Sequence, residues 1–521
     1  MTVKSINGPI VTVSGGQFSM SEMVEINGLP GEIIALTQNV ATIQVYENTA
    51  GLRPGAEVTG TGQPLSVKLQ PGIVGNIFDG IFRPLGETID KMEIAGQARN
   101  DVGYRNDVGY SNDEVTWPTR ILVSPGQHLH EGGIYAEVAE TPLITYKAML
   151  PPGLSGIVTS AAPDGNYTSS HPIITLDNST TLTLSQQWPI RTPRPIKIRQ
   201  PLSRPLITGQ RVIDTFFPIA KGGVAAIPGG FGTGKTMTQH QLAKWCDADL
   251  IVYIGCGERG NEMTEVLEDF ARLTDPKNGQ PLLNRTILIA NTSDMPVAAR
   301  EASIYTGITI AECYRDMGYH VAVMADSTSR WAEALRELSG RLGEIPAEEG
   351  YPAYLATRLS AFYGRAGYVT NLNGTDGSVT IVGAVSPQGG DFSEPVTTHT
   401  KRFIRCYWAL DRRLAYARHF PAIDWMNSYS NYLPQLAGWY AKKISPKFME
   451  LRDTAMAILI EEHALLEIAK LVGTDALSQS QRETLARAKR IRQEFLQQNA
   501  YDPQDTFMPV NKQFELLSSL W

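Results

Sequence analysis

The spacing of hydrophobic positions divides the chain into stretches of different pattern. Residues 1–70 hold short apolar runs separated by Gly and Pro turns, as at 8–15 and 39–46. Evenly spaced strands and turns predict a small N-terminal β-barrel. Residues 71–90 are predicted to be a connector between this barrel and the rest of the chain.

The stretch 91–195 is again β-rich and holds many Gly, Pro, Asn and Thr residues. It contains the pentapeptide Asn-Asp-Val-Gly-Tyr twice, at 100–104 and 106–110. Two copies of five residues are too few for a solenoid. We therefore expect a β-rich domain with a mobile surface loop at the repeat.

Between residues 196 and 432 strands alternate with helices. Short apolar runs of the buried parallel-strand type occur at 224–227, 251–254, 286–289 and 321–325. Helical patterns lie between them, and one begins at 297. This alternation predicts a doubly wound α/β domain.

From 433 to 521 the pattern is helical. An apolar helix face is predicted from spacing, with the members Met456, Leu459, Ile460, His463, Leu466 and Leu471. The segment 486–495 follows the same logic. We expect a helical bundle here.

Composition narrows the function classes. The chain has 521 residues, of which 42% are hydrophobic and 19% charged, with a net charge of −7. Such a chain can fold into three or four domains of about 150 residues each. Since no block of Lys and Arg is present, direct nucleic-acid binding is not expected. No run of 18 apolar residues occurs, and residues 1–8 lack the apolar core of a signal peptide.

The segment 229–236 has the spacing of a phosphate-binding loop, Gly-x-x-x-x-Gly-Lys-Thr. Glycines let successive backbone N–H groups point at the phosphates, and the helix that follows adds its positive N-terminal dipole. Lys235 would contact the β- and γ-phosphates, and the hydroxyl of Thr236 would coordinate Mg²⁺. The alternative, a chance glycine-rich turn, is disfavoured because a buried strand precedes the loop and an amphipathic helix with Met237, Leu242 and Trp245 follows it. The predicted nucleotide-binding residues are Gly229, Gly230, Phe231, Gly232, Thr233, Gly234, Lys235, Thr236 and Met237.

Asp326 ends the apolar run 321–325. An Asp at the carboxyl end of such a strand can bind Mg²⁺ through water near a phosphate loop. It could instead cap a helix, because Ser-Thr-Ser follows and a helical run begins near Trp331. The position after a phosphate loop favours the metal-linked role.

Glu258 and Arg259 follow the run 251–254, where a parallel strand opens toward a ligand crevice. The carboxylate could polarise the water that attacks the γ-phosphate, and the guanidinium could pair with phosphate oxygens. The two residues could equally form a solvated charged turn. Spacing alone favours the catalytic interpretation only slightly.

These residues are specific enough to identify a resemblance. The segments 206–236, 255–263, 290–302, 324–336 and 389–396 resemble the catalytic A subunit of V/A-type rotary ATPases. The similarity runs from about 78 to about 515. It implies a multidomain α+β fold with an N-terminal β-barrel (1–70), a β-rich insertion domain (91–195), a central P-loop α/β domain of the RecA-like type (196–432) and a C-terminal helical bundle (433–521).

The resemblance also implies an activity and its residues. The chain would hydrolyse or synthesise ATP with Mg²⁺, coupled to stalk rotation and to transport of H⁺ or Na⁺. Lys235 and Thr236 would contact the phosphates and Mg²⁺, Glu258 would orient water beside Arg259, and Asp326 would take the Walker B position. Both Asp326 and Glu258 would reach the metal through water. The resemblance further implies that Phe420 stacks on the adenine and that Tyr501 covers the same pocket.

The partners follow from the resemblance as well. Three copies of the chain would alternate with three non-catalytic B subunits, which would supply an arginine finger. Central and peripheral stalks would connect this hexamer to a membrane sector, so that the chain would be cytoplasmic and peripheral to the membrane.

The insertion 91–195, ending in Trp-Pro-Ile-Arg-Thr-Pro-Arg-Pro at 188–195, resembles a domain that F-type β subunits lack. Three departures from the family pattern stand out. Position 230 is Gly where Pro or Ala is usual, which should loosen the loop. Position 233 is Thr where eukaryotic relatives have Cys. The chain ends some tens of residues before most members, and the missing part is expected to belong to the helical bundle.

Two other classes remain as alternatives. One is another ring ATPase: an F-type β subunit, an export ATPase or a terminating helicase. The insertion and the acidic balance disfavour it. The other is a non-catalytic nucleotide-binding subunit, which would have no need for Lys235, Thr236, Glu258 and Asp326 together.

Overall fold

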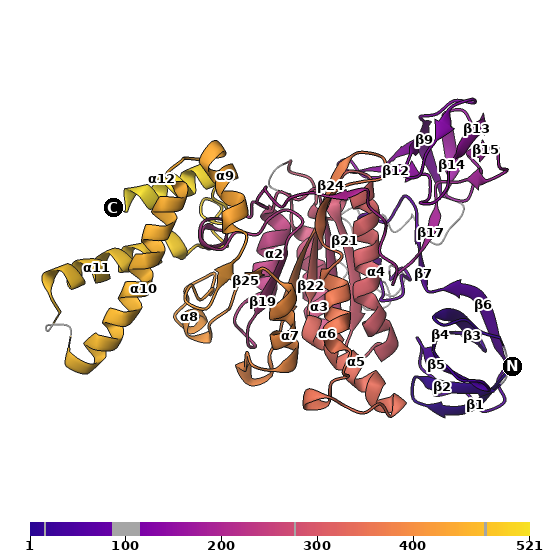
Figure 1. Cartoon of the computed structure of the whole chain (residues 1–521), viewed down its shortest axis with the longest axis horizontal. Coiled ribbons are helices and arrows are strands. Elements are labelled where there is room, and N and C mark those ends of the chain that lie inside the picture. The colour runs from indigo at the N-terminus through magenta and orange to yellow at the C-terminus, as the bar shows by residue number, and fades with distance from the viewer. Residues whose placement is uncertain (15–16, 86–114, 276–277, 474–476, 521) are drawn as a thin grey trace. The chain divides into compact units, whose positions relative to one another are not determined.

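The computed structural model describes residues 1–14, 17–85, 115–275, 278–473 and 477–520. Figure 1 labels the helices and strands of the described residues. The chain divides into two compact units. The first comprises Met1–Gln200, Asp249–Arg365 and Val369–Val379, and the second Pro201–Ala248, Ala366–Tyr368 and Thr380–Trp521. The expected domain boundary near residue 90 and the repeat at 100–104 and 106–110 lie outside the described residues.

The first unit begins with an antiparallel barrel. Its strands run in the order β1 (Thr2–Asn7), β2 (Ile10–Ser14), β5 (Val40–Val45), β4 (Leu29–Leu36), β3 (Glu22–Ile26) and β6 (Val58–Pro64). A bridge between Thr2 and Glu57 brings β1 to the residues just before β6. The sheet therefore closes on itself, as the strand and turn spacing predicts.

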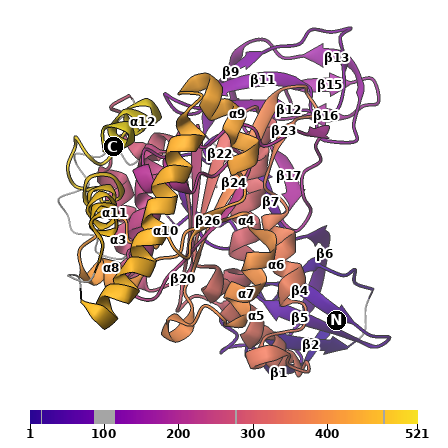
Figure 2. The same ribbon diagram turned by 60° about the vertical axis from the view of Figure 1, so that its left-hand side comes forward.

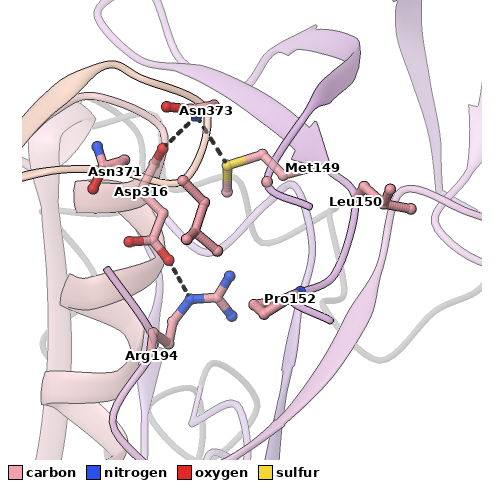
Figure 3. A pocket seen from close by; sticks show the side chains of 9 residues that line it. Met149, Leu150, Pro152, Arg194, Asp316, Asn371 and Asn373 are labelled. Atoms are coloured by element: carbon pink, nitrogen blue, oxygen red, sulfur yellow. Dashed lines mark hydrogen bonds and ion pairs between the residues drawn. The ribbon is translucent and has the colours of Figure 1, made fainter. Parts of the chain in front are cut away.

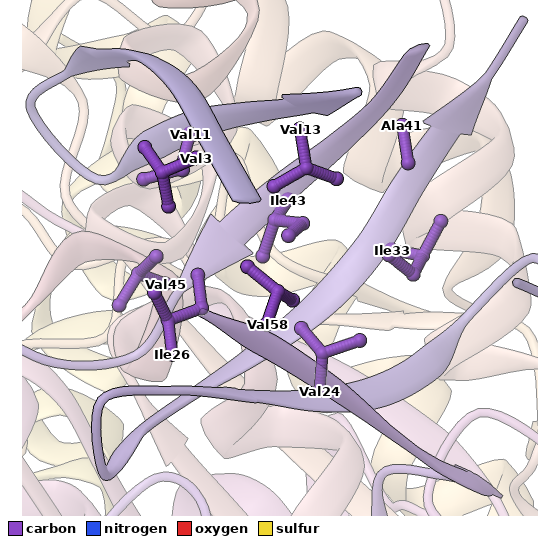
Figure 4. Packing of buried hydrophobic residues seen from close by; sticks show 10 residues of the cluster. All are labelled: Val3, Val11, Val13, Val24, Ile26, Ile33, Ala41, Ile43, Val45 and Val58. Atoms are coloured by element: carbon purple, nitrogen blue, oxygen red, sulfur yellow. The ribbon is translucent and has the colours of Figure 1, made fainter. Parts of the chain in front are cut away.

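Alternation of side chains along each strand fills the inside of this barrel (Figure 4). Its core consists of small β-branched and aliphatic side chains, namely Val3, Val11, Val13, Val24, Ile26, Ile33, Ala41, Ile43, Val45 and Val58. Burying one such Val or Ile side chain stabilises the fold by roughly 1.5–3 kcal/mol. The short strands thus hold together through a core of their own.

The β-rich insertion forms two four-stranded antiparallel sheets. One has the order β12 (Thr145–Met149), β11 (Ile134–Ala139), β9 (Thr116–Ile121) and β14 (Gly165–Thr168). The other has the order β10 (His128–Leu129), β13 (Gly156–Ala161), β15 (Ile174–Leu176) and β16 (Thr181–Leu182). Outside these sheets, β17 (Gln186–Pro189) pairs with β7 (Ser66–Leu69), so the segments before and after the insertion run side by side.

The central part of the first unit is a parallel sheet with helices. Strands β8 (Ile77–Phe78), β21 (Thr286–Thr292), β20 (Leu250–Glu258) and β22 (His320–Asp326) are neighbours in this order. The helices are α3 (Gly260–Arg272), η2 (Leu282–Arg285), α4 (Val297–Asp316), α5 (Thr328–Leu342), η3 (Glu348–Gly350) and α6 (Leu355–Tyr363). Helix α4 contacts β20, β21 and β22. The strands predicted at 251–254, 286–289 and 321–325 are therefore confirmed.

Buried ion pairs join the insertion and the barrel to α4. Arg191, which follows β17, donates hydrogen bonds to Glu32 of the barrel and Glu301 of α4. Arg194 Nε lies 2.6 Å from Asp316 Oδ2. Figure 3 shows this second pair beside Met149 of the insertion, in a small pocket that Asn373 also lines. Since Arg194 is buried, breaking its pair with Asp316 should cost roughly 3–5 kcal/mol.

The division between the units falls within β23 (Gly367–Thr370) and β24 (Asp376–Val385), and β18 (Ile198–Arg199) pairs with β23 in the first unit. The second unit has the strand order β26 (Tyr429–Ser430), β25 (Cys406–Tyr407), β19 (Val224–Pro228) and β24. Strand β19 is parallel to both of its neighbours. The strand predicted at 224–227 is thus confirmed as well.

The second unit is rich in helices, and Figure 2 shows several of them, among them α9, α10, α11 and α12, from a second side. They are η1 (Val212–Phe216), α2 (Lys235–Trp245), η4 (Gln388–Gly390), α7 (Pro395–Phe403), α8 (Arg412–Tyr416), α9 (Leu433–Lys443), α10 (Phe448–Val472), α11 (Gln479–Arg490), η6 (Ile491–Leu496) and α12 (Val510–Ser519). Helix α10 contacts α9, α11 and α12. None of the helices in the described ranges is both long and apolar enough to span a membrane.

The predicted apolar face of α10 is partly wrong. Leu459 is buried, but the exposed fractions of Ile460, Leu466 and Leu471 are 52%, 42% and 86%. The buried positions at its centre are Ala455, Leu459, Glu462 and Leu465. Glu462 is tolerated there because Arg492 pairs with it at 2.8 Å. At this buried position an ion pair takes the place of an apolar contact. The hydrophobic pattern could not indicate this, because it counts Glu462 as a polar, exposed position.

Candidate nucleotide site

The phosphate loop lies in the second unit, between the end of β19 at Pro228 and the start of α2 at Lys235. Gly232 and Gly234 have φ angles of 76° and 89°, a conformation that side chains other than Gly rarely adopt. The ammonium of Lys235 donates to the carbonyls of Gly229 and Gly230 at 2.8 and 3.0 Å. The loop therefore curls around a cation, as a binding site for phosphate requires.

Threonine hydroxyls hold the backbone of this loop. Thr233 Oγ1 donates to the carbonyl of Gly230 at 2.8 Å, and Thr238 Oγ1 donates to the carbonyl of Gly234 at 2.8 Å. Gly229 has no room for a side chain, because a Cβ atom there would lie 2.5 Å from Thr233 Oγ1. These contacts fix the loop before any ligand binds.

Several side chains of the loop face outward. Phe231 has an exposed fraction of 80%, and Thr236 is exposed in the first turn of α2. Met237, predicted to lie on the buried side of an amphipathic helix, is instead 37% exposed, whereas Leu242 is buried. Met237 occupies the first turn of α2, next to Thr236, so it lies at the end of the helix that faces the loop.

Phe420 is placed beside this loop. A Cβ atom at Gly234 would lie 3.9 Å from Cε1 of Phe420, and 41% of Phe420 is exposed. Its carbonyl accepts a hydrogen bond from the backbone N–H of Gln498 at 2.7 Å. Tyr501, three residues after Gln498, has an exposed fraction of 81%. An exposed aromatic ring next to a phosphate loop has the chemistry needed to stack on a base.

Arg412 lies beside the loop, although no motif in the sequence singles it out. A Cβ atom at Gly230 would lie 3.2 Å from its Nη2 atom. Gly230 has no positive φ, so an Ala could adopt its backbone conformation if Arg412 shifted slightly. The departure at position 230 therefore leaves space for a guanidinium beside the loop.

Glu258 and Asp326 lie in the first unit at the carboxyl ends of two adjacent parallel strands, β20 and β22. Gly255, near the end of β20, pairs with Asp326. Gly257 has a φ of 71°, and a Cβ atom there would lie 2.8 Å from Cδ of Arg300. Gly257 thus allows a β-bulge at the end of β20, where the register with β21 shifts between Cys256 and Glu258.

Burial raises the pKa of Glu258 to about 8, and the negative charges of Asp326 and Glu262 add to this effect. The positive charge of Arg330 acts in the opposite direction. Because Glu258 is mostly buried, the interpretation as a solvated charged turn is wrong for this residue. Arg259 does fit that description, since 63% of its side chain is exposed, and its Nη1 atom lies 3.9 Å from Oε1 of Glu262.

Asp326 does not cap the helix that follows it. Ser327 takes the N-cap position of α5, and its hydroxyl accepts the backbone N–H of Arg330. The helix begins at Thr328, three residues before the predicted start near Trp331. Asp326 is buried, and its Oδ2 atom accepts a hydrogen bond from the hydroxyl of Tyr253 at 3.1 Å. The capping alternative is therefore wrong.

Tyr253, Arg330 and Ser327 also belong to this edge, and sequence patterns alone do not identify them. Burial raises the pKa of Tyr253 well above its usual value, and the neighbouring charge of Asp326 adds to the shift. Tyr253 thus stays protonated and can donate to the carboxylate. A Tyr near the middle of a buried strand, directly after an Ile-Val pair, resembles any core residue.

Comparison with known proteins defines the family. The nucleotide-binding domain of the ATP synthase alpha/beta family matches residues 209–430, its β-barrel domain 3–62 and its barrel-sandwich domain 111–191. The C-terminal domain of V and A type ATP synthases matches 437–521. The V-type ATP synthase alpha chain 2 of Clostridium tetani is 58% identical over 525 residues, covering 100% of this chain and 88% of that protein.

The chain belongs to the family of catalytic A subunits of V- and A-type ATP synthases. The corresponding chain of the A-type ATP synthase of Methanopyrus kandleri is 55% identical to it over 531 residues, covering 99% of this chain and 88% of that protein. The family carries the catalytic sites of rotary ATP synthases. The chain is accordingly an ATP hydrolase of the ion-translocating class, as the resemblance predicts.

A solved structure shares the fold at greater distance. The assembled ATPase EscN of the enteropathogenic E. coli type III secretion system superimposes with a TM-score of 0.70 at 20% identity, covering 100% of this chain and 99% of that one. At this identity the likeness concerns the fold alone. The high identity to the V- and A-type chains therefore decides between their family and the export ATPases considered as an alternative.

Proposed function

We propose that two groups of residues act on one ATP molecule. The first is the phosphate loop, residues 229–236, and the second is the carboxylate edge, which we define as Glu258 and Asp326 at the ends of β20 and β22. Lys235 and the backbone N–H groups of 229–236 bind the phosphates, as a cradle of this shape does elsewhere. We propose that Glu258 orients the attacking water; once deprotonated, a carboxylate whose pKa is raised is a stronger proton acceptor than an ordinary Glu. Arg259, whose side chain is largely exposed, turns toward phosphate oxygens when the nucleotide binds.

The oxygen donors of both regions fit Mg²⁺, which prefers hard oxygen ligands and is usually held by one or two protein groups, water and substrate phosphates. Thr236 offers an exposed hydroxyl in the first turn of α2. Asp326 offers a carboxylate whose orientation Tyr253 fixes. When bound, the ion would neutralise charge on the phosphates. Asp326 and Glu258 would hold its water ligands in place.

For the adenine we propose Phe420 as the stacking partner and Tyr501 as a cover on the same pocket. The support for Phe420 is its position next to Gly234 and its partial exposure. The support for Tyr501 is the hydrogen bond that joins its loop to the backbone of Phe420 through Gln498. A ring in each position can contact a base without hydrogen-bond readout.

We further propose the assembly that the family implies. Three copies alternate with three non-catalytic B subunits, and an arginine from the B subunit completes each site. Central and peripheral stalks connect the hexamer to the membrane sector, which the chain itself does not enter. The chain is then cytoplasmic and peripheral to the membrane, and it binds no nucleic acid.

The observation that carries this proposal is the inward ammonium of Lys235 within the curled loop. Lys235→Ala should abolish ATP binding and turnover together, because the charge contacts the phosphates in both the ground state and the transition state. Lys442→Ala, on the exposed end of α9, removes the same charge elsewhere and should change neither. Calorimetric ATP titration and phosphate release by the complex measure both quantities. A Lys235→Ala variant that keeps a tenth of the wild-type turnover would refute the assignment.

A further inference from the structure

Arg211 is a buried residue of the second unit that the mechanism above does not use. Its exposed fraction is 3%, and it lies directly before η1, 18 positions before the phosphate loop begins. Its guanidinium donates to the carbonyl of Phe495 at 2.6 Å, to the carbonyl of Gln497 and to Asp505 Oδ1 at 2.5 Å. All three acceptors belong to the segment 495–505, which includes Tyr501.

One arm of this network leads to Phe420. The backbone N–H of Arg211 donates to Gln498 Oε1 at 2.8 Å. The amide nitrogen of the same Gln498 side chain donates to the carbonyls of Gly209 and Asp505, at 2.9 and 2.7 Å. Gln498 is 2% exposed, and its backbone N–H binds the carbonyl of Phe420 at 2.7 Å. The position of Phe420 is therefore tied to Gln498 by its main chain.

The other arm leads to Tyr501. Asp505 uses its second oxygen, Oδ2, to accept the backbone N–H of Asn499 at 2.7 Å. The side-chain oxygen of Asn499 accepts the backbone N–H of Tyr501 at 3.0 Å, which forms an Asx turn. Arg211, Asp505, Asn499 and Tyr501 thus form one chain of contacts.

The same loop is held against the helix that starts at the phosphate loop. Trp245 of α2 stacks on Phe507 with ring centroids 5.0 Å apart, and its indole N–H donates to Thr506 Oγ1 at 3.1 Å. Gly209 lies under Phe507, since a Cβ atom at Gly209 would come within 1.9 Å of that ring. Two independent contacts therefore set the distance between α2 and the loop.

Only an Arg suits the position of Arg211. Its planar fork of N–H donors reaches three acceptors in different directions, whereas the ammonium of a Lys is a point charge on a flexible stem. All these acceptors lie on the segment 495–505, so the fork fixes that segment as a unit. Losing the fork would loosen this segment without touching the phosphate loop itself.

We infer that Arg211 is a positioning residue for binding of the nucleotide base, acting through Gln498 on Phe420 and through Asp505 and Asn499 on Tyr501. This inference rests on the proposed function, in which those two aromatic residues contact the base. Arg211 touches no substrate. It keeps the aromatic rings in place before the nucleotide binds, and so lowers the cost of ordering the loop on binding.

The test compares two ligands on the full-length chain: Mg-ATP, which has a base, and Mg-tripolyphosphate, which has only the phosphates. Arg211→Lys should weaken ATP binding about tenfold, within the range that stacking on an aromatic ring supplies. Tripolyphosphate affinity should stay within about twofold, because the phosphate loop is unchanged. In the complex, KM for ATP should rise while kcat at saturation is retained.

Two controls separate this role from general stability. Arg285→Lys alters a comparably buried pair, with Asp275 at 2.8 Å, in the first unit, and should lower the melting temperature without changing the ratio of the two affinities. Asn499→Ala changes an exposed residue and so should fold normally, yet it should weaken ATP binding by about threefold through loss of the Asx turn.

The inference is overturned if Arg211→Lys weakens both ligands by the same factor, or if neither Arg211→Lys nor Asn499→Ala weakens ATP binding. Failure of the proposed function gives a different result. In that case the wild-type chain binds neither ligand, or Lys235→Ala retains its affinity for tripolyphosphate. The positioning role is supported if Arg211→Lys and Asn499→Ala both weaken ATP binding while tripolyphosphate binding is retained.

Discussion

The phosphate loop and the carboxylate edge differ in their electrostatic environments. In the loop the half-exposed ammonium of Lys235 is held by the carbonyls of Gly229 and Gly230. Its positive charge favours the binding of an anion. At the edge two carboxyl groups, Glu258 and Asp326, are held near each other and largely out of water, which raises the pKa of Glu258 to about 8. The first arrangement attracts phosphate, and the second disfavours extra negative charge.

This difference indicates that the phosphate loop serves mainly nucleotide binding and the carboxylate edge mainly the chemical step. A preformed cradle contributes to ground-state affinity, because its donors need no rearrangement to receive phosphate. A carboxyl group in an unfavourable environment contributes little to affinity, but it has the proton affinity that activation of water requires. We therefore expect variants of the two regions to separate binding from turnover.

The largest expected effect concerns what both regions lack. Neither includes the arginine finger, which we propose the B subunit supplies, and such fingers contribute roughly 10³–10⁵ to the rate. The chain alone should bind ATP but hydrolyse it slower than the complex by that factor. Phosphate release by equal amounts of chain, alone and with its B partner, measures this. Equal turnover in the two samples would contradict the proposal that the B subunit contributes an arginine to the catalytic site.

A smaller effect should appear in the stability of the carboxylate edge. A Glu with a folded-state pKa near 8 and an unfolded value near 4.5 holds its proton more tightly when folded, so its contribution to the free energy of unfolding falls as pH rises from about 4.5 to about 8. Glu258→Gln removes this penalty. Without nucleotide, the variant should gain about 1–2 kcal/mol over wild type at pH 8, after allowing for partial exposure, and almost nothing at pH 4.5.

Thermal unfolding at the two pH values measures that gain. Its sign is decisive, because an exposed Glu258 with an ordinary pKa would give no dependence on pH in this range. A loss of stability in Glu258→Gln at pH 8 would show that the charged form is the favoured one.

The smallest effect separates Asp326 from its neighbour. Ser327→Ala removes the N-cap of α5 and should lower the free energy of unfolding by about 1 kcal/mol. ATP affinity should remain unchanged, since the hydroxyl of Ser327 binds a backbone N–H of the helix. Asp326→Asn should instead reduce turnover with little loss of stability. If Asp326→Asn lowered the stability and Ser327→Ala reduced turnover instead, Asp326 and not Ser327 would be the cap of α5.

Local patterns made the binding region predictable. The glycine spacing at 229–236 and the strand before it determine the loop, because the hydrogen bonds of Thr233 and Lys235 that hold it join residues within a few positions of one another. The parallel strands that end at Glu258 and Asp326 were predictable for a similar reason: apolar runs of that length are buried on both faces.

Contacts between distant segments could not be predicted in this way. Arg211 binds residues 284 to 294 positions later, and no local spacing connects them. On α10 a buried Glu462 depends on Arg492, so the hydrophobic pattern indicated the wrong face in part. The cap at Ser327 was missed because Asp326 and Ser327 are both good capping residues, and only the backbone geometry decides between them.

The most direct test of the division between binding and chemistry is a paired measurement on Glu258→Gln in the assembled hexamer. The amide keeps the size and most hydrogen bonding of the side chain but cannot accept a proton from water. Single-turnover hydrolysis should slow by about 10² or more. ATP affinity by calorimetry should stay within roughly threefold, a change of under about 0.7 kcal/mol. Near-normal hydrolysis in this variant would contradict the catalytic role of Glu258, and an equal loss of binding and turnover would contradict the division itself.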